Sequence, residues 1–416
     1  MNLFKKITAV TAVAALMLAF TSCEIETRDT YEIDSSGAHT ITYEKGEEPT
    51  MNLAEKTNDV SAGNDIGSDT IKDAIDSTLQ NGPDEGKEVT EIKVCITGDI
   101  KIDGTIIEDS RKAAEDVEGR DYSFLRLYTG AYRLINDADL AFCSYSSALN
   151  PVGVKSDYDY TDDYTEDETT GALTTPKEAL TAISDAGFDV VDTSGAGGAG
   201  DCDSLFADTE MLNVSTSVSD YDAIQTVEIS GVTFGFVAVD TSDDEDKTKE
   251  RTDTLEYADV MSDILVVSVH WGSEMSFDDK EAFAMDIANA GADIIVGDGD
   301  AVSEIKWIET DDGTSTLVAY SLGNLVSNAD EGYRLVSGVL SFTVLVDDNM
   351  LEMTDTLVTP VFMFYDGERS GFQVYKLEDC NSEVLSRHGA EVSKDGLIDF
   401  IKGRISSEFL PATLAG

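Results

Sequence analysis

The sequence predicts an α/β fold, an α+β sandwich of mixed β-sheets flanked by helices. From about residue 90, apolar strand-like runs alternate with segments whose apolar side chains recur at helical spacing. Antiparallel pairs follow, because residues 226–239 are typical of a hairpin turning at Ser230-Gly231, and residues 316–364 contain two further strand pairs. Alternating strands and helices place helices on the faces of a sheet, and hairpins add antiparallel strands.

The strands are recognised as short apolar runs between turn residues. The first ends at Gly98-Asp99, and the last before the hairpin ends at Asp192. The acidic segment between the hairpin and the strand that ends at His270 is expected to be a loop. The expected strands cover residues 92–97, 140–143, 188–192, 264–270 and 294–296.

One helix carries a start signal as well as a periodicity. Thr175 is expected to be its N-cap, with Pro176 at the first helical position and Glu178 at the third, which is the capping-box arrangement. Gly187 is expected to end this helix, since glycine accepts the left-handed backbone found there. Further helices are expected over residues 124–135, 280–290 and 396–409.

The charge balance excludes one large class of partner. The chain has 83 acidic and 28 basic residues, and its formal net charge is −55. Such a charge repels polyanions, so no nucleic-acid partner is expected. Acidity of this kind favours solubility outside the cell. Weak Ca²⁺, Mg²⁺ or Mn²⁺ binding stays open, because hard cations favour carboxylate oxygens.

The N-terminus is typical of a bacterial lipoprotein signal peptide over residues 1–22. Lys5 and Lys6 precede the apolar run Ile7–Phe20, which is short for a bilayer span of about 20 residues. Cys23 follows small residues and is the expected lipidation site. The mature protein is then lipid-anchored through acylated Cys23 on the extracytoplasmic side of the cell membrane. An ordinary signal peptide or an uncleaved anchor is the alternative.

Composition separates two parts of the mature chain. Residues 23–89 are rich in acidic and small polar residues, which predicts a disordered tether. Residues 90–416 form the expected folded domain. Sequence alone leaves the disulfide state of the remaining cysteines and the oligomeric state open. These cysteines are Cys95, Cys143, Cys202 and Cys380.

Several segments, in this order, resemble the CapA family of poly-γ-glutamate capsule synthesis proteins. Two motifs carry most of the resemblance, His270-Trp271-Gly272 with Glu274, and the segment Tyr320–Asn324. The resemblance implies a calcineurin-like metallo-dependent phosphatase fold. The other matching segments are Thr97–Asp99, 136–140, 185–191 and 290–297.

The resemblance fails at the positions where the family has metal ligands. An Asn-Leu-Glu motif of the family is replaced by Ser144–Ser146, and an Ala-Asn-Asn-His motif by Ser194–Gly197. A His-His-Pro-His motif is replaced by residues 298–301, which contain two aspartates. Ser, Gly and Ala cannot coordinate in place of amides and imidazoles, whereas two-metal hydrolysis needs two nearly complete protein shells.

No catalytic or metal-ligating residue is therefore assigned, and no cofactor is expected. Asp99 and His270 keep ligand-type side chains at matching places, although a turn-forming carboxylate and a structural strand end are the alternative interpretations. Asp298 and Asp300 can join Asp99 in an oxygen-only site for one hard cation. Asn324 completes the residual pocket candidates, with loop shaping as its alternative role.

These observations predict a cell-surface lipoprotein of the CapA type. It is expected to be a catalytically degenerate component of capsule, poly-γ-glutamate or envelope-polymer synthesis, so the balance is against an enzyme. Its expected partners are the membrane, the polymer and the synthesis machinery. Two alternatives stay open: a metal-dependent hydrolase with an altered Asp-rich site, and a solute-binding lipoprotein.

Overall fold

The computed structural model describes residues 31–33, 39–41, 89–115, 121–149, 174–195, 206, 209–215, 224–241, 248–272, 275–347 and 350–415. Contacts divide the chain into two units, Met1–Pro83 and Asp84–Gly416. In the first unit, β1 (Tyr31–Ile33) pairs antiparallel with β2 (His39–Ile41). The predicted leader and Cys23 lie outside the described residues. The boundaries of leader, tether and folded body stay predictions.

The second unit contains a six-stranded mixed sheet in the order β13-β14-β12-β11-β10-β9. Its four central strands are parallel, and each edge strand is antiparallel to its neighbour. The predicted hairpin is confirmed as β9 and β10, with positive φ at Ser230 and Gly231. The strands are β9 (Gln225–Ile229), β10 (Val232–Asp240), β11 (Ile264–His270), β12 (Ile294–Gly297), β13 (Ile305–Glu309) and β14 (Ser315–Ala319).

A second, eight-stranded mixed sheet has the order β18-β17-β16-β3-β4-β7-β8, and β15 pairs with β3 off this path. Strands β15, β3, β4, β7 and β8 are parallel, while β16, β17 and β18 add antiparallel pairs. The strands are β3 (Thr90–Ile100), β4 (Leu140–Tyr145), β7 (Val190–Asp192), β8 (Leu212–Val214), β15 (Asn324–Val326), β16 (Val336–Asp347), β17 (Met350–Phe364) and β18 (Gln373–Lys376).

The two sheets share one core. Phe142 of β4 and Phe236 of β10 stack with ring centroids 5.7 Å apart. Side chains along a strand alternate between faces, so on β11 Val266 packs into this core, whereas Leu265 packs in a second cluster. That cluster includes buried residues of α7 (Thr248–Met261) and α8 (Phe277–Asn289). His270 shares the face of Val266 and is directed toward the larger sheet.

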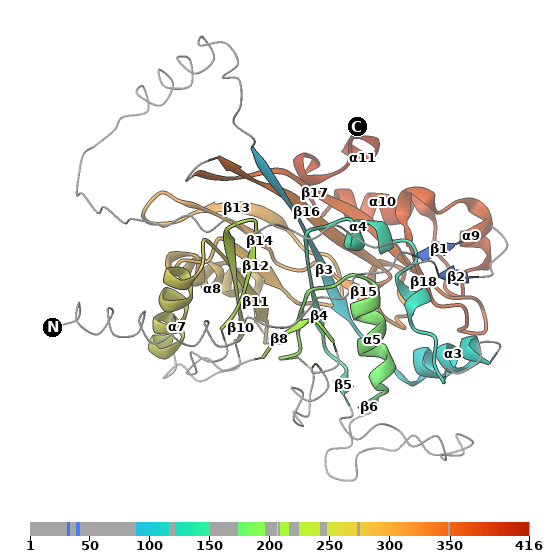
Figure 1. The fold of residues 1–416 in the computed structure, drawn as a ribbon. Helices are drawn as coiled ribbons and strands as arrows, with labels where there is room; N and C mark the ends of the chain where they lie inside the picture. The colour runs from blue at the N-terminus through green and yellow to red at the C-terminus, as the bar shows by residue number, and fades with distance from the viewer. Residues whose placement is uncertain are drawn as a thin grey trace. The chain divides into compact units, whose positions relative to one another are not determined.

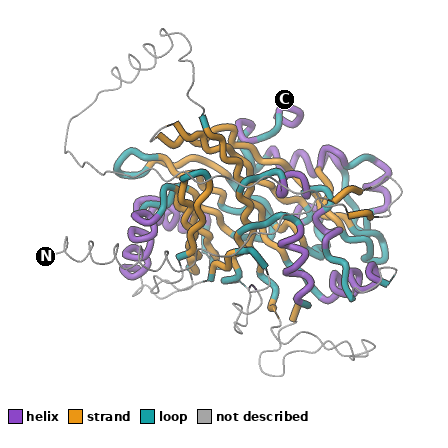
Figure 2. Tube along the Cα trace, in the orientation of Figure 1, coloured by secondary structure: helices purple, strands orange, loops and turns teal. Residues whose placement is uncertain are grey.

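Helices also lie on the side of the larger sheet away from α7 and α8, as Figures 1 and 2 show for α5 and α10. The predicted sandwich of mixed sheets flanked by helices is confirmed by this arrangement. The remaining elements are α3 (Gly104–Ala114), η1 (Leu125–Tyr128), α4 (Tyr132–Asn136), β5 (Ala148–Leu149), β6 (Thr174–Thr175), α5 (Lys177–Asp185), η4 (Gly332–Arg334), η5 (Leu377–Asp379), α9 (Ser382–Arg387), α10 (Lys394–Lys402), η6 (Ser407–Phe409) and α11 (Ala412–Ala415).

The predicted capping box of α5 is wrong. The helix begins at Lys177, and Pro176 occupies the N-cap position without a side-chain hydrogen bond. Thr175 pairs with Leu149 in β6 and β5, and its buried hydroxyl has no hydrogen-bond partner among the described residues. Because Thr175 belongs to strand β6, it lies before the helix and does not act as its N-cap. Gly187 follows the helix with a φ of 100°, as predicted.

The helix expected over residues 124–135 is also wrong as one continuous element. It is interrupted at Gly130, whose backbone N–H donates to the carbonyl of Val374 on β18 at 2.8 Å. A Cβ at Gly130 would lie 2.3 Å from that same oxygen. The close contact of Gly130 with β18, which is distant in sequence, therefore interrupts the helix. Local periodicity contains no information about such a contact.

Two further expectations need correction. The acidic segment before β11 contains α7, in which Leu255 and Ala258 are buried against the smaller sheet while charged residues cover the outside. The C-terminal helix expected over residues 396–409 is shorter, since α10 ends at Lys402 and the rest of that range contains the 3₁₀ turn η6. In α7 a few apolar positions decide the packing and abundant charges hide them, whereas α10 ends at its C-cap residue Gly403.

Three of the cysteines in question are described, and all three are buried free thiols: Cys95, Cys143 and Cys380. Burial raises the pKa of Cys95 to about 12, which makes its thiol unreactive at neutral pH. Cys202 lies outside the described residues. No helix within the described part of the chain is both long and apolar enough to cross a membrane.

Candidate functional site: a charged cluster between the sheets

Polar side chains gather where parallel strands of both sheets end. Asp99 lies near the carboxyl end of β3 and Asp192 at the end of β7, while His270 ends β11 and Asp298 follows β12. Ligands of open α/β sheets commonly bind outside the carboxyl ends of the strands. Together with two neighbouring residues, these side chains form what we call the charged cluster: Asp99, Lys101, Asp192, His270, Asp298 and Asp300.

His270 connects the two sheets through its ring nitrogens. Its Nε2 lies 3.0 Å from Oδ2 of Asp192, and its Nδ1 lies 3.1 Å from Oδ2 of Asp298. Ser268, two residues earlier on the same face of β11, donates its hydroxyl to the same oxygen of Asp192. The backbone N–H of Trp271 donates to Asp298 at 3.0 Å. The imidazole is therefore held from both sides.

This arrangement stabilises a charged imidazole. Burial alone would lower the pKa of His270, but the hydrogen bonds and negative charges of Asp192 and Asp298 outweigh it and raise the pKa to about 10. Burial alone would likewise raise the pKa of the fully buried Asp192. The hydrogen bond and charge of His270 overcome this, and the pKa of Asp192 is lowered. The two residues form a buried ion pair at neutral pH.

Asp99 is buried beside this pair. Its Oδ2 accepts a hydrogen bond from the hydroxyl of Ser146 at 2.5 Å and lies 3.5 Å from Nζ of Lys101. Burial raises the pKa of Asp99, and the negative charge of Asp298 acts in the same direction, while Lys101 opposes both. Asp99 is therefore electrostatically coupled to both halves of the cluster.

Lys101 joins Asp99 to Asp300. Its Nζ donates to Oδ1 of Asp300 at 2.8 Å, and this hydrogen bond is the first cause that lowers the pKa of Asp300. Arg334 adds a longer contact, with Nη1 at 3.7 Å from Oδ2 of Asp300. In a chain of net charge −55, an ammonium group between two carboxylates compensates a local excess of negative charge.

Asn324 lies next to Asp99 in the sheet. The two residues are Cα partners in the parallel pairing of β15 with β3. The amide Nδ2 of Asn324 lies 3.5 Å from Oδ1 of Asp300. Oδ1 of Asp99 and Oδ1 of Asn324 are both buried, and neither has a hydrogen-bond partner among the described residues. Buried polar atoms are normally satisfied, so these two oxygens require an explanation.

A binuclear metal centre does not fit these residues. Both nitrogens of His270 face carboxylate oxygens, so neither lone pair is available to a metal while the imidazole carries both protons. The ammonium group of Lys101 lies on Asp99 and Asp300, where it repels a second cation. No group of three or more His, Cys, Asp or Glu residues within the described ranges has an arrangement suited to holding a metal ion.

Ser194, His270 and Asp298 have the connectivity of a nucleophilic triad. The hydroxyl of Ser194 contacts Nε2 of His270, and Asp298 contacts Nδ1. In such a triad a neutral imidazole accepts the proton of the hydroxyl. Here Asp192 contacts the same Nε2, Ser194 also donates to Asp192, and the pKa of His270 is about 10. The protonated imidazole can donate a proton but cannot act as the base.

The predicted pocket candidates fall into two groups. His270 and Asp298 are in direct contact, and Asp99, Asp300 and Asn324 meet around Lys101 and the end of β3. The two groups are coupled electrostatically through Asp99 and Asp298. Glu274 and residues 196–197, the second half of the segment Ser194–Gly197, lie outside the described residues.

Sequence reasoning missed Lys101 and Asp192, although both carried a signal. Asp192 ends a strand that was itself predicted, and polar residues at the carboxyl ends of parallel strands are candidates for a site. Lys101 stands two residues after Asp99, but no local pattern indicates that an ammonium group turns back onto the carboxylate. Ser146 and Ser194 occupy positions of lost ligand motifs and still contribute hydroxyl groups, which donate to Asp99 and Asp192.

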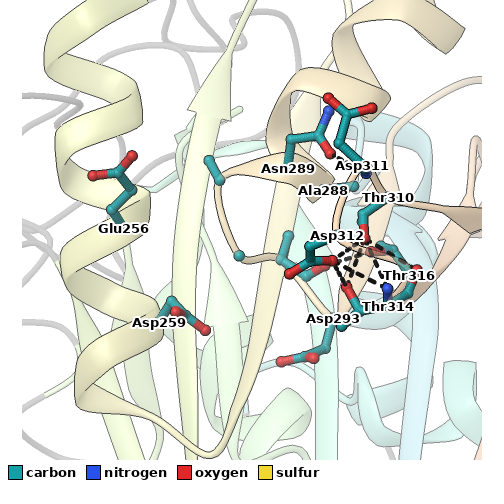
Figure 3. Close-up of a pocket in the computed structure, with 13 residues that line it drawn as sticks. Glu256, Asp259, Ala288, Asn289, Asp293, Thr310, Asp311, Asp312, Thr314 and Thr316 are labelled. Carbon is teal, nitrogen blue, oxygen red and sulfur yellow. Dashed lines mark hydrogen bonds between the residues drawn. The ribbon is translucent and has the colours of Figure 1, made fainter. Parts of the chain in front are cut away.

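A separate acidic pocket of about 420 Å³ lies at the other end of the smaller sheet, near the amino ends of β12 and β14 (Figure 3). Asp293 accepts the backbone N–H of Leu265 at 2.8 Å, and burial raises its pKa to about 6. Asp312 accepts hydrogen bonds from Thr310 and Thr314 and shapes the β13–β14 turn. These carboxylates therefore have structural partners, away from the charged cluster.

Part of the sequence matches the model of a known protein family. Residues 207–329 match the family model described as "Bacterial capsule synthesis protein PGA_cap". The predicted resemblance to the capsule-synthesis family is confirmed over this segment. The matched segment includes His270, Asp298, Asp300 and Asn324, whereas Asp99, Lys101 and Asp192 of the charged cluster precede it.

The remaining comparisons add solved structures only. One, a novel phosphatase from Mycoplasma pneumoniae, has 11% sequence identity and a TM-score of 0.41, and the match covers 66% of this chain and 94% of that one. Another, a hypothetical protein from Thermus thermophilus, has 12% identity and a TM-score of 0.38, covering 65% of this chain and 99% of that one. No curated protein matches the chain.

Proposed function

We propose that this protein is a cell-surface component of capsule or envelope-polymer synthesis that binds or positions its ligand without hydrolysing it. The match of residues 207–329 to the capsule-synthesis family model supports the biological setting. The charged cluster supports the absence of hydrolysis, because His270 has no free lone pair for a metal ion and Lys101 already compensates Asp99 and Asp300. In this proposal the cluster orders the carboxyl ends of the parallel strands, where ligands of such sheets commonly bind.

One observation carries the proposal. His270 has its two ring nitrogens 3.0 Å and 3.1 Å from the carboxylates of Asp192 and Asp298. A histidine that ligates a metal presents one bare nitrogen to the ion and donates from the other. With carboxylates on both nitrogens, the doubly protonated ring is the stable form. The imidazole of His270 therefore has no lone pair with which to coordinate a metal ion.

The direct test combines metal analysis with activity. The full-length chain is purified after growth with added Mn²⁺ or Zn²⁺, its bound metal is counted, and hydrolysis of phosphoesters and of γ-glutamyl bonds is assayed. We expect no stoichiometric transition metal and no turnover above background. Stoichiometric metal together with turnover that disappears in Asp99→Asn and His270→Gln would refute the proposal.

Polymer binding needs its own experiment because of charge. A polyglutamate ligand and a chain of net charge −55 repel each other unless cations lie between them. We expect binding to poly-γ-glutamate only when Ca²⁺ is present, with loss on chelation. A neutral polysaccharide serves as the control, since an uncharged polymer is not repelled and needs no Ca²⁺ between it and the protein. Binding to neither polymer under any condition counts against the binding role.

Anchoring through Cys23 is the second part of the proposal. It is supported by the lysines, apolar run and small residues that precede this cysteine. In cells fed a labelled fatty acid, the wild-type chain should carry the label and remain with membranes, whereas Cys23→Ser should lose both. Cys95→Ser is the matched control, because that thiol is buried within β3. An unlabelled wild-type chain would remove the anchor from the proposal.

A hydrolase with a single altered metal site is the second candidate. The observation that favours it is the pair of unpartnered buried oxygens on Asp99 and Asn324. In that case an activity would depend on added metal and would be abolished in Asp298→Ala. Absence of any metal-dependent activity in the wild-type chain eliminates this candidate.

A further inference from the structure

We propose that Lys101 is a built-in cation that takes the place of a bound metal ion, and that its removal creates a site for one divalent cation between Asp99, Asp300 and Asn324. This inference rests on the proposed function, in that the wild-type cluster is taken to work without a metal centre. It goes beyond that proposal by naming the residue that keeps the metal out.

The position of Lys101 is the first argument. Its Nζ lies 2.8 Å from Oδ1 of Asp300 and 3.5 Å from Oδ2 of Asp99. These carboxylates come from segments far apart in sequence, the end of β3 and the chain after β12. An ammonium group that connects two such carboxylates does what a hard cation would do, because it compensates both charges at one point.

Two unpartnered oxygens are the second, independent argument. Asp99 and Asn324 are 4% and 3% exposed, and Oδ1 of each lacks a hydrogen-bond partner among the described residues. The two residues are register partners, so their side chains leave the same face of the sheet at neighbouring strands. The ammonium group contacts only one oxygen of Asp99, whereas a hard divalent cation is held by several oxygen ligands at once.

The backbone keeps these groups in place without Lys101. The N–H of Asp99 donates to the carbonyl of Gly323 at 3.1 Å, and the N–H of Lys101 donates to the carbonyl of Val326 at 2.9 Å. Both bonds belong to the backbone, so a change of the Lys101 side chain preserves them. Removing only the ammonium group therefore leaves the carboxylates of Asp99 and Asp300 around the vacated volume, and a flip of the Asn324 amide would place its Oδ1 where Nδ2 now lies, 3.5 Å from Asp300.

The experiment compares four forms of the full-length chain: wild type, Lys101→Met, Lys101→Arg and the double variant Lys101→Met with Asp99→Asn. Mn²⁺ is titrated into each, and free Mn²⁺ is followed by its electron paramagnetic resonance signal. Methionine preserves the length of the side chain without the charge. Arginine preserves the charge, and the double variant removes a proposed ligand while the other surface carboxylates stay unchanged.

We expect Lys101→Met to bind one Mn²⁺ more per chain than wild type, about tenfold more tightly than the surface carboxylates bind it. Lys101→Arg should behave like wild type, and the double variant should lose the added site. The inference is overturned if a folded Lys101→Met gains no ion, or if the double variant keeps the gained one. If Lys101→Met is unfolded without metal, refolding in Mn²⁺ supports the inference, and failure to refold in Mn²⁺ overturns it.

The outcomes separate this inference from the proposed function. A wild-type chain that already holds stoichiometric Mn²⁺ contradicts both. A metal-free, inactive wild type whose Lys101→Met variant gains no ion contradicts only the role of Lys101. Polymer binding is measured in a different experiment, so a chain that binds no polymer can still be tested in the Mn²⁺ titration.

Discussion

Nε2 of His270 lies 3.0 Å from Oδ2 of Asp192, a carboxylate with no exposure to solvent. The contact joins the smaller sheet to the larger one at the carboxyl ends of β11 and β7. A buried ion pair of this kind contributes little net stability relative to apolar residues, but removing one partner leaves an uncompensated charge and is strongly destabilising. We therefore expect the pair to favour this arrangement of the two sheets more than it adds to the stability of the hydrophobic core.

Replacing Asp192 with Asn should lower the pKa of His270 from about 10 toward its ordinary value. Asp192 supplies the larger of the two carboxylate hydrogen-bond effects on the imidazole, so Asp298→Asn should lower the pKa of His270 by less. The measurement is an NMR titration of the imidazole protons in the wild type and both variants. An unchanged pKa of His270 in Asp192→Asn contradicts the pairing.

The pairing of His270 with the two carboxylates should stabilise the fold less as pH rises. The pKa of His270 is raised on folding, so its contribution is fully present below about pH 6.5, its ordinary value, and is lost as pH rises toward 10. The difference in unfolding free energy between wild type and His270→Gln should therefore shrink over this interval. Urea unfolding at pH 6, 8 and 9.5 measures it. A difference that grows with pH would reverse the assigned sign.

Much of this fold was predictable from local patterns. Short apolar runs between turn residues identified β3, β4, β11 and β12, and Ser230-Gly231 identified the β9–β10 hairpin, because these signals depend on neighbouring residues only. The failures share one physical origin. Gly130 interrupts a helix because β18 approaches it, and Thr175 does not cap α5 because it pairs with Leu149 of β5. Neither partner is near in sequence.

The charged cluster was predictable only in part, for the same reason. Asp99, His270 and Asp298 were identified from the resemblance and from their positions at strand ends. That Asp192 contacts His270 depends on how the two sheets face each other, and that Lys101 contacts Asp300 depends on where the chain goes after β12. Both contacts are long-range, so neither periodicity nor motif spacing contains them.

His388 should make the fold sensitive to acid. Burial lowers the pKa of His388 to about 4, while its Nδ1 accepts the backbone N–H of Tyr365 at 3.3 Å. The unfolded chain then binds this proton more readily, so stability falls as pH decreases from about 6.5 toward 4. His388→Gln keeps a hydrogen-bond acceptor but does not titrate.

The readout for His388 is the difference between wild type and His388→Gln, because the many carboxylates of the chain titrate equally in both. Unfolding free energies at pH 7 and pH 5 should show that wild type loses more stability than the variant over this interval. Equal losses would mean that His388 is not held neutral in the folded state.

Gly98 should not tolerate a side chain. A Cβ there would lie 1.8 Å from the carbonyl oxygen of Gly323, which accepts the N–H of Asp99. Gly98→Ala must separate β3 from β15 and should cost more than about 3 kcal/mol, as expected for overpacking against backbone. Gly367→Ala is the matched control, since nothing lies within 4 Å of a Cβ there. Equal unfolding free energies for the two variants would contradict the close approach.

Asp109 of α3 should be a major stabilising residue even though it lies away from the charged cluster. It is 4% exposed and accepts the hydroxyl of Ser370 at 2.8 Å and the backbone N–H groups of Gly371 and Phe372 at 3.0 Å each, and it pairs with Arg126. These contacts hold the chain that enters β18 against α3.

Asp109→Asn keeps the size of the side chain but removes the charge that Arg126 requires and turns one acceptor into a donor. Breaking a buried charged pair typically costs about 3–5 kcal/mol, whereas Ser370→Ala removes one neutral hydrogen bond and should cost about 1 kcal/mol. Urea unfolding of the two variants against wild type gives both values. If Asp109→Asn costs no more than Ser370→Ala, the carboxylate is not the group that holds this segment in place.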